Sequence, residues 1–234
     1  MNVVIVCGGL STRLGDITKH VPKILLDIGG RTVLDWQLAM LRPLGVSRVV
    51  LAAGHLSDVL QKQVGTSYKG FDIVYAVEEK KLGTGGAIKN AFSYIDTLDE
   101  PTLILNGDVL STVNFGDMVN QLRHGSDGLI LGTKVDDAST YGTLAYDETH
   151  HLLSFKEKEG KQIEGYINGG VYLFTTQATA YFPDEDAFSI EYDVFPHMKE
   201  LYVYLSDSPW IDVGVPERLA WAREHADVFS SVVL

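Results

Sequence analysis

The sequence predicts an α/β fold of the Rossmann-like kind, with a central, mostly parallel mixed sheet flanked by helices. Three observations support this prediction. Short β-branched runs alternate with helix-like segments through the first half, which is the pattern of right-handed βαβ units. The second half instead has strand-like runs separated by turns. With 45% hydrophobic and 21% charged residues, the 234-residue chain has the composition of a globular protein rather than of a disordered one.

In the first half, apolar periodicity and turn residues define each element in order. The expected strands are Asn2–Cys7, Arg48–Ala53, Asp72–Val77 and Thr102–Leu105. The expected helices are Thr32–Leu41, Leu56–Val64 and Thr84–Tyr94. Thr32 is placed to cap the first helix, Pro43 follows its end, and Gly65 ends the second.

In the second half, we expect strands at Gly142–Tyr146, Leu152–Lys156 and Tyr166–Phe174. Helices are expected at Ser189–Glu200 and Val215–Phe229, with Pro216 in the first turn of the latter. No internal repeat or linker separates the halves. We therefore expect one domain over residues 1–234.

The charge of the chain bears on its partners. Nineteen Lys and Arg residues against 31 Asp and Glu residues give a net charge of −12, which argues against a nucleic-acid partner because polyanion binding needs a basic face. Residues 1–48, however, hold six basic and three acidic residues, an imbalance that favours a local anion site. Chance scatter of surface charge remains the alternative.

Cys7 is the single cysteine, so an internal disulfide and a Cys-based zinc site are excluded. Its apolar surroundings predict a buried, inert thiol. The N-terminal residues lack the basic flank of a signal peptide, and no stretch approaches the ~20 apolar residues of a membrane span. We therefore expect no membrane partner and a cytoplasmic location.

A glycine-containing loop, residues 7–14, follows the first strand directly. Gly8 and Gly9 let the backbone approach a ligand closely, and backbone N–H groups there can hold phosphate oxygens. Arg13 adds a guanidinium suited to phosphate, and Lys23 adds a mobile point charge. The spacing is neither Gly-x-Gly-x-x-Gly nor a Walker loop, and a tight turn beside a solvated arginine is the alternative interpretation.

This loop and several later motifs resemble those of the sugar-1-phosphate nucleotidylyltransferases. The motifs are Gly8-Gly9-x-Ser11-Thr12-Arg13-Leu14 with Pro22-Lys23, then Leu82-Gly83-Thr84-Gly85-Gly86-Ala87, Asn106-Gly107-Asp108, Tyr141-Gly142, Phe155-x-Glu157-Lys158, Ile167-Asn168-Gly169-Gly170-Val171-Tyr172 and Trp210-Ile211-Asp212-Val213-Gly214. They occur in the family's order over nearly the whole chain. Within the family, the resemblance is strongest to short guanylyltransferases that act on D-glycero-α-D-manno-heptose 1-phosphate. One departure is Ser11, where the family usually has glycine; another is Glu159, where proline commonly follows the lysine.

The resemblance implies a nucleotidyltransferase fold with a nucleotide-binding half, about residues 1–135, and a sugar-phosphate-binding half, about residues 136–234. The implied catalytic residues are Arg13, Lys23 and Asp108. The implied nucleotide-binding residues are Gly8, Gly9, Ser11, Thr12, Glu78, Gly83 and Thr84. The implied sugar-phosphate-binding residues are Gly142, Glu157, Lys158, Asn168 and Gly169.

The implied metal ligands are Asp108 and Asp212. Asp108 follows an apolar strand, and Asp212 lies about a hundred residues later, after Trp210-Ile211. Two carboxylates that converge suit Mg²⁺, a cofactor that prefers oxygen ligands and keeps waters and substrate phosphates. Either aspartate alone is equally compatible with capping a loop or a helix.

Glu78 bears on the choice of nucleotide, because the corresponding residue in the resembled family contacts the base edge. A carboxylate only accepts hydrogen bonds, and guanine offers N1–H and the N2 amino group side by side. Uracil and thymine present one N–H between two carbonyls and match a carboxylate poorly. The alternative is that Glu78 belongs to a solvated charged run with residues 79–81.

These observations predict an enzyme whose partners are GTP and a sugar 1-phosphate, giving a nucleotide sugar and pyrophosphate. Guanylylation or uridylylation of a hexose 1-phosphate is an alternative. A nucleotide-binding module without turnover and a glycosyltransferase of similar fold are two others. Assembly into a homo-oligomer stays open.

Overall fold

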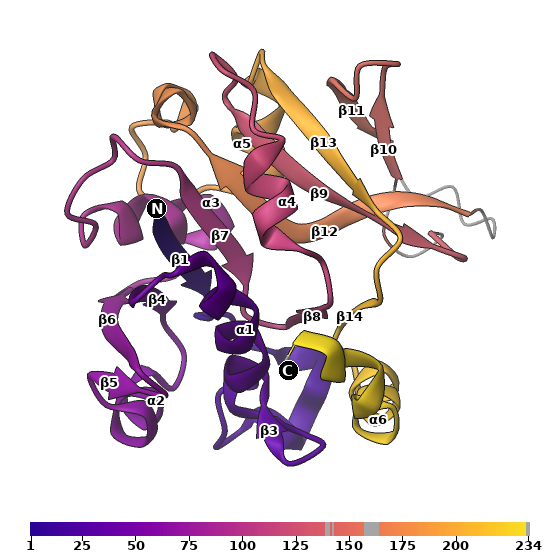
Figure 1. Cartoon of the computed structure of the whole chain (residues 1–234). Coiled ribbons are helices and arrows are strands. Elements are labelled where there is room, and N and C mark those ends of the chain that lie inside the picture. The colour runs from indigo at the N-terminus through magenta and orange to yellow at the C-terminus, as the bar shows by residue number, and fades with distance from the viewer. Residues whose placement is uncertain (139–140, 142, 157–163, 233–234) are drawn as a thin grey trace.

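The computed structural model describes residues 1–138, 141, 143–156 and 164–232. In this part of the chain, the centre is an eight-stranded sheet in the order β13-β9-β12-β7-β1-β4-β6-β5 (Figure 1). In chain order its strands are β1 (Asn2–Val6), β4 (Arg48–Ala53), β5 (Ser67–Tyr68), β6 (Phe71–Val77), β7 (Thr102–Asn106), β9 (Gly128–Val135), β12 (Gly165–Phe174) and β13 (Leu201–Ser206).

The sheet is mixed, as predicted. β1 pairs in parallel with β4 and β7, and β4 pairs in parallel with β6. The crossovers between these strands contain α1 (Val33–Leu41), α2 (Ser57–Val64) and α3 (Gly83–Phe92). β12 is antiparallel to both β7 and β9, whereas β13 runs parallel to β9. The α/β class and the βαβ order of the first half are therefore confirmed.

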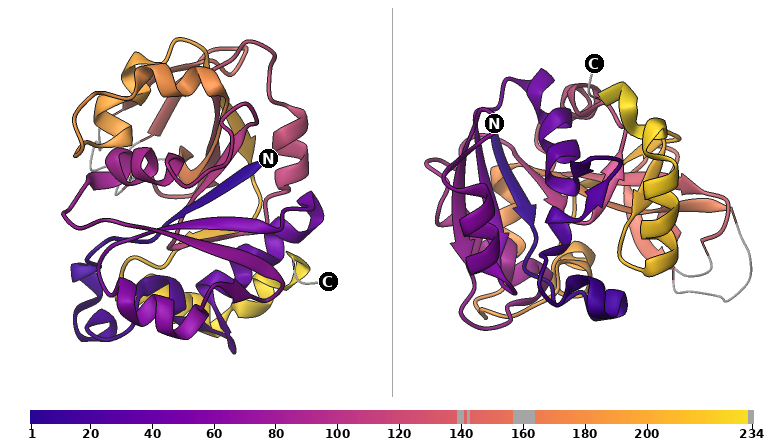
Figure 2. Two further views of the ribbon diagram at one scale, coloured as in Figure 1. Left: turned by 90° about the vertical axis from the view of Figure 1, so that its left-hand side faces the viewer. Right: turned by 90° about the horizontal axis from the view of Figure 1, so that it is seen from below.

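Helices lie on both faces of the sheet (Figure 2), and the buried residues form two large apolar cores. Alternation along β1 shows the division, because Val3 packs with Leu38 of α1 while Val4 packs with Ile88 of α3. Each fully buried aliphatic side chain of this kind contributes about 1.5–3 kcal/mol of hydrophobic free energy. The layers thus fix the carboxyl ends of β1, β4, β6 and β7 at one edge.

Local capping explains why the first-half helices begin and end where predicted. Thr32 accepts a hydrogen bond from the Asp35 N–H at 3.1 Å, and Asp35 accepts one from the Thr32 N–H at 3.0 Å, which forms a capping box. α2 ends at Gly65, whose φ of +70° lies in the left-handed region. No helix in the described residues has the length and apolar character needed to cross a bilayer.

A third core links the C-terminal segment to the sheet edge. β8 (Val109–Ser111) pairs antiparallel with β14 (Trp210–Asp212), so that Val109 lies opposite Asp212. α6 (Pro216–Glu224) packs Leu219 against Ile211 and Trp36. The remaining elements are α4 (Phe115–Asn120), α5 (Ile190–Asp193), and the hairpins β2 (Asp27–Ile28) with β3 (Arg31–Thr32) and β10 (Thr143–Tyr146) with β11 (Leu152–Lys156).

The predicted helix over 189–200 is wrong in its second half. α5 ends at Asp193, and a 3-10 turn over Phe195–His197 contains Pro196, which lacks an N–H and disfavours helix in the preceding residue. The helix predicted over 215–229 is also shorter in the structure. It ends at Glu224, because His225 leaves helical geometry, and a 3-10 segment over Ala226–Val232 follows.

Three strands of the central sheet, β5, β9 and β13, were not predicted from the sequence. β9 contains Gly128 and Gly132, which weaken a strand pattern. Packing explains Gly132, because a Cβ there would lie 2.6 Å from Cγ1 of Val203 on β13. Both β9 and β13 therefore depend on a contact that is distant in sequence.

Candidate active site

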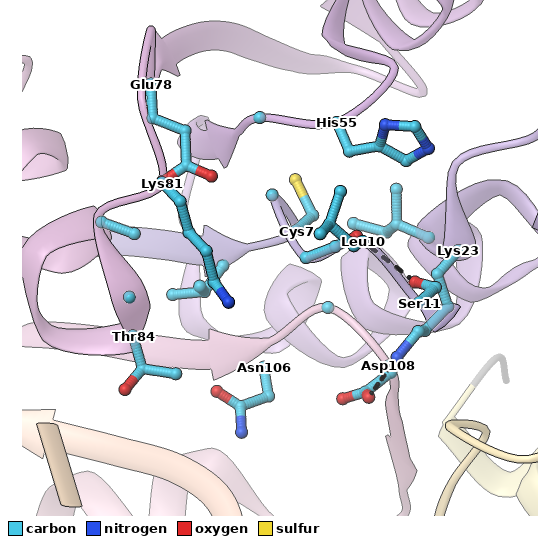
Figure 3. Close-up of a pocket in the computed structure, with 18 of the residues that line it drawn as sticks. Cys7, Leu10, Ser11, Lys23, His55, Glu78, Lys81, Thr84, Asn106 and Asp108 are labelled. Atoms are coloured by element: carbon cyan, nitrogen blue, oxygen red, sulfur yellow. Dashed lines mark hydrogen bonds and ion pairs between the residues drawn. The ribbon is translucent and has the colours of Figure 1, made fainter. Parts of the chain in front are cut away.

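A cavity of about 530 Å³ opens at the carboxyl ends of the parallel strands (Figure 3). Its walls are residues 6–11 after β1, 54–55 after β4, 78–81 after β6, 106–108 after β7 and the start of α3. Ligands of open α/β sheets bind at this edge, outside the carboxyl ends of the strands. The topology therefore brings the first three predicted motifs to one place.

Gly8 belongs to a closely packed part of the cavity wall. A Cβ at Gly8 would lie 2.9 Å from Oε1 of Glu78 and 3.0 Å from the backbone nitrogen of Gly54. The Gly8 carbonyl also accepts a hydrogen bond from the His55 N–H at 3.1 Å. At Gly9, in contrast, a Cβ would meet nothing within 4 Å and would face open space. The loop therefore needs glycine at position 8 for packing and leaves room for a ligand at position 9.

Ser11 adopts a backbone conformation that usually favours glycine. Its φ is +52°, in the left-handed region. Its side chain donates to the Gly9 carbonyl at 3.3 Å, and its own carbonyl accepts from the Thr18 hydroxyl at 3.2 Å. These local bonds hold serine in a conformation that suits the glycine usual in the resembled family. Thr12 follows as an exposed residue and is not among the residues that line the cavity.

The two predicted metal ligands lie side by side although they are far apart in sequence. The Val213 N–H donates to the Asp108 carbonyl at 2.9 Å, next to the β8–β14 pairing. A Cβ at Gly214 would lie 2.8 Å from Oδ1 of Asp212, 3.4 Å from Nη2 of Arg13 and 3.6 Å from Oδ2 of Asp108. Both carboxylates and the Arg13 guanidinium therefore converge on Gly214.

Lys23 also contacts one of these carboxylates, that of Asp108. Its Nζ lies 2.9 Å from Oδ2 of Asp108, and the two side chains are only 17% and 24% exposed. Both residues line the cavity. The Lys23 ammonium therefore lies at the end of the cavity that Asp108 forms.

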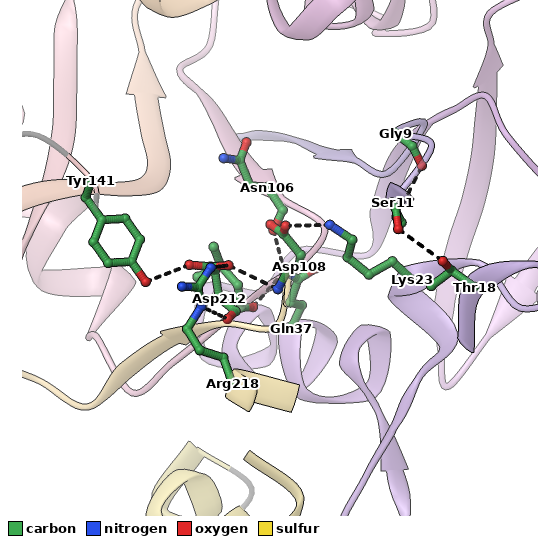
Figure 4. A network of polar contacts seen from close by, with 12 residues as sticks. Gly9, Ser11, Thr18, Lys23, Gln37, Asn106, Asp108, Tyr141, Asp212 and Arg218 are labelled. Carbon is green, nitrogen blue, oxygen red and sulfur yellow. Dashed lines mark hydrogen bonds and ion pairs between the residues drawn. The ribbon is translucent and has the colours of Figure 1, made fainter. Parts of the chain in front are cut away.

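Asp212 is held by two residues to which no role was predicted from the sequence (Figure 4). Arg218 donates from Nη2 to Oδ1 at 2.7 Å and from Nε to the Asp212 carbonyl at 2.9 Å. The Tyr141 hydroxyl donates to Oδ2 at 3.1 Å. Burial and, next, the Asp212 charge raise the pKa of Tyr141 to about 12, so its hydroxyl remains a donor at neutral pH.

The chemistry of these side chains fits Mg²⁺. Its protein sites commonly supply only one or two carboxylates, and water and substrate phosphates complete the octahedron. Asp108 and Asp212 form such a pair. No group of three or more His, Cys, Asp or Glu residues able to hold a metal occurs in the described ranges.

Glu78 forms part of the cavity wall at the end away from Asp108 (Figure 3). Its Oε2 accepts a hydrogen bond from the Leu82 N–H at 3.1 Å. Burial raises the pKa of the Glu78 carboxyl above its usual range, while the Leu82 N–H and Lys81 act in the opposite direction. This placement differs from a solvated charged face.

Lys81 also differs from a member of a solvated charged run. It lines the cavity, and Figure 3 shows its side chain running into it. Its neighbour Lys80 pairs with Asp186 at 2.8 Å, but Lys81 has no ion pair within the residues that the structure describes. Because residues 78–81 carry two negative and two positive charges in a row, nothing in the sequence distinguished Lys81 from Lys80.

Gly83 and Thr84 line the cavity where α3 begins. Gly83 has φ +75°, and a Cβ there would lie 2.5 Å from the Phe188 carbonyl oxygen. The Thr84 hydroxyl donates to Glu191 at 2.8 Å and accepts from the Ile190 N–H at 3.0 Å. Both residues thus connect the nucleotide half to α5 and the segment before it.

Of the predicted sugar-phosphate-binding residues, Asn168 and Gly169 lie in β12 at the position where its register with β9 shifts. Asn168 donates to the Tyr172 hydroxyl at 3.1 Å and accepts from the Gly170 N–H at 2.9 Å. The Gly169 carbonyl accepts from the Trp210 indole at 2.8 Å. The predicted Gly142, Glu157 and Lys158 lie outside the described residues.

Cys7 lines the cavity as a half-buried residue. Burial raises the pKa of its thiol to about 12, and the charge of Glu78 acts in the same direction. The thiol is therefore protonated at neutral pH and a poor nucleophile, as expected from the sequence. His55 and Asn106 also line the cavity, although neither was predicted as a site residue.

Comparisons with known proteins agree with this geometry. Residues 2–227 match the nucleotidyl transferase family. The chain is 33% identical over 220 residues to the D-glycero-α-D-manno-heptose 1-phosphate guanylyltransferase of Campylobacter jejuni subsp. jejuni serotype O:2, covering 93% of this chain and 96% of the relative. It is 34% identical over 224 residues to mannose-1-phosphate guanyltransferase beta-A of Xenopus laevis, covering 93% of this chain but 62% of that relative.

A solved structure gives the same result. The crystal structure of HddC from Yersinia pseudotuberculosis complexed with GMP-PN has a TM-score of 0.83 and 33% sequence identity, covering 95% of this chain and 98% of that one. The family match spans both halves of the chain and includes all the motifs described above. The chain belongs to the nucleotidyl transferase family.

Proposed function

We propose that the protein transfers GMP from GTP to D-glycero-α-D-manno-heptose 1-phosphate, giving GDP-heptose and pyrophosphate. The observation that carries this proposal is the convergence of Asp212 and Arg13 on Asp108, which lines one end of a cavity whose other end holds Glu78. The guanylyltransferase relatives support the reaction class and the nucleotide. A GTP donor also suits the cytoplasmic location expected from the sequence.

In the proposed reaction, a phosphate oxygen of the sugar 1-phosphate attacks the α-phosphorus of GTP. The new P–O bond forms as the bond to the bridging oxygen breaks, and pyrophosphate leaves with that electron pair. The displacement is in line and needs no covalent enzyme intermediate, so catalysis rests on positioning and charge neutralisation. Arg13 neutralises the developing pyrophosphate charge, and Lys23 holds phosphate oxygens beside Asp108.

Asp108 and Asp212 would hold Mg²⁺, which when bound neutralises phosphate charge and aligns the α-phosphate. The chain's own residues prepare this arrangement. Lys23 orients Asp108, whereas Arg218 and Tyr141 orient Asp212. These contacts satisfy the carboxylate oxygens in the partly buried edge of the sheet, where an unpaired charge is unfavourable.

Glu78 would select guanine by accepting hydrogen bonds from N1–H and the N2 amino group. A bidentate contact to a base edge discriminates by ~1–3 kcal/mol in nucleic-acid recognition. Uracil and thymine would set a carbonyl oxygen against the carboxylate. The GMP-PN complex of the Yersinia relative supports the choice of a guanine nucleotide.

Asn168 can both donate and accept hydrogen bonds with hydroxyls of many sugars, so the choice of sugar rests on the relatives. Mannose 1-phosphate is the second candidate, because relatives named for it match at 34% identity. The heptose relatives match along nearly their whole length, which favours heptose. A single hydroxymethyl unit separates the two sugars, and such differences discriminate only modestly.

Pyrophosphate release from a panel of substrates tests the proposal. GTP, UTP, dTTP and ATP are each combined with heptose, mannose and glucose 1-phosphates at equal concentrations. We expect the highest kcat/KM for GTP with the heptose. Preference for UTP or dTTP contradicts the role of Glu78, and preference for mannose 1-phosphate transfers the assignment to the second candidate.

A further inference from the structure

A buried glutamine, Gln37, lies in α1 beneath the turn that carries Asp108 (Figure 4). Its side chain is 1% exposed, and its helix neighbours Leu34 and Leu38 are core residues. Burying an amide is unfavourable unless its polar atoms find partners. An aliphatic residue would suit packing at this position better, so the amide calls for a reason beyond packing.

The Gln37 amide bridges the two ends of the turn. Its Nε2 donates to the Asn106 carbonyl at 2.8 Å and to the Val109 carbonyl at 3.0 Å. These two carbonyls flank Gly107 and Asp108, so one nitrogen fixes the separation of the residues on either side of Asp108. Oε1 of Gln37 has no hydrogen-bond partner in the described part of the chain. In the described residues, Gln37 therefore forms hydrogen bonds through its Nε2 donors and not through its Oε1 acceptor.

Within the part of the chain that the structure describes, the other hydrogen bonds to the backbone of this turn come from main-chain groups. The Gly107 N–H donates to the Val6 carbonyl at 2.8 Å on β1, and the Val213 N–H donates to the Asp108 carbonyl at 2.9 Å beside β14. A Cβ at Gly107 would lie 2.8 Å from the same Val6 oxygen. Gln37 is the one side chain that hydrogen-bonds to the backbone of residues 106–109 among the described residues.

We propose that Gln37 is a positioning residue that sets where the Asp108 carboxylate stands relative to Asp212 and Arg13. The inference rests on the proposed transferase function of the site. Without the two donors, the Asn106 and Val109 carbonyls lose their side-chain partner and the turn relaxes away from α1. A displacement of about 1 Å at a reacting group can lower the rate by about 10²-fold.

The test substitutes Gln37→Met, which keeps the length of the side chain and removes both donors. The matched control is Thr175→Val. The Thr175 hydroxyl lies 2.7 Å from the Ser126 carbonyl and 3.2 Å from the Asp127 carbonyl, with Oε1 of Gln177 at 2.6 Å, so its one proton also serves a buried stretch of backbone. It follows β12 at the end of the sheet opposite the cavity. Each variant loses a side-chain donor to backbone carbonyls, so both are expected to lower the melting temperature.

We expect Gln37→Met to lower kcat by roughly 10- to 100-fold, with the KM for GTP within about twofold of the wild type because Glu78 and the glycine loop are untouched. Thr175→Val should keep the wild-type kcat. Equal kcat values for the two variants, at equal loss of melting temperature, overturn the inference. If Gln37→Met does not fold, Gln37→Leu replaces it, since an aliphatic side chain also lacks both donors and buries no polar atom.

A second readout separates this inference from the proposed function. Mn²⁺ binding in the presence of a non-hydrolysable GTP analogue is measured by electron paramagnetic resonance, which needs no turnover. Absence of pyrophosphate with every substrate pair refutes the proposed function alone. Weaker Mn²⁺ binding by Gln37→Met than by Thr175→Val then still supports the positioning role, and equal binding contradicts it.

Discussion

A backbone hydrogen bond of 2.9 Å from Val213 to Asp108 joins the two motifs on which the site depends. It sits beside the antiparallel pairing of β8 and β14 and brings Asp212 next to Asp108. The two aspartates are therefore brought together by sheet geometry rather than by a flexible loop. Asp212 ends β14, and Asp108 lies in the short turn just before β8.

Replacing Arg13 with alanine should abolish pyrophosphate release, with a loss of at least about 100-fold for a charge that is needed mainly in the transition state. Arg13 is exposed, so the free energy of unfolding should change by less than about 0.5 kcal/mol. Arg123→Ala, at an arginine that bonds the Thr149 carbonyl far from the cavity, is the control. Full activity of the Arg13 variant would remove it from the mechanism.

Glu78→Gln should lower the preference for GTP over UTP. Losing a bidentate acceptor corresponds to ~1–3 kcal/mol, or roughly a 5- to 150-fold change in the ratio of kcat/KM values. Glu148→Gln, at an exposed glutamate that does not line the cavity, is a matched control with the same change of charge and should keep the wild-type ratio. An unchanged ratio in Glu78→Gln would show that this carboxylate does not contact the base.

Glu78→Gln should also change how the free energy of unfolding depends on pH. Burial raises the pKa of Glu78 above the ordinary value of 4.5, so the unfolded chain ionises this group first as pH rises. The wild type therefore loses stability from Glu78 as pH rises from the unfolded pKa to the higher folded pKa. Thermal unfolding should show that Glu78→Gln gains more over the wild type at pH 7 than at pH 4. An equal difference at both pH values would contradict the shift.

Lys81→Ala should raise the KM for GTP about tenfold with little change in kcat, because the lysine faces the cavity and lacks an ion-pair partner within the described residues. Lys80→Ala is the control at the neighbouring position, since Lys80 is paired with Asp186. The KM is measured at two ionic strengths, because a charge contact with phosphate should weaken with salt. Similar KM values for both variants would argue against a contact between Lys81 and the nucleotide.

Features that depend on local interactions were predictable from the sequence, and features that depend on distant ones were not. The helix after Thr32 was predicted because its capping box is local, whereas β9 was missed because Gly132 is explained only by Val203 across the sheet. The cavity walls after β1, β6 and β7 were predicted from motifs at strand ends. Gln37 and Arg218 carry no local signal, since each acts through contacts that only the tertiary fold creates.

The central claim is that Asp108, Asp212 and Arg13 together hold a metal-bound triphosphate at one end of the cavity. A crystal structure with Mn²⁺ and a non-hydrolysable GTP analogue, read from the anomalous signal of the metal, tests it most directly. We predict a peak within about 2.2 Å of carboxylate oxygens of both aspartates, with Arg13 on the phosphates and the guanine at Glu78. A metal bound away from either aspartate, or a triphosphate at another edge of the sheet, would contradict the claim.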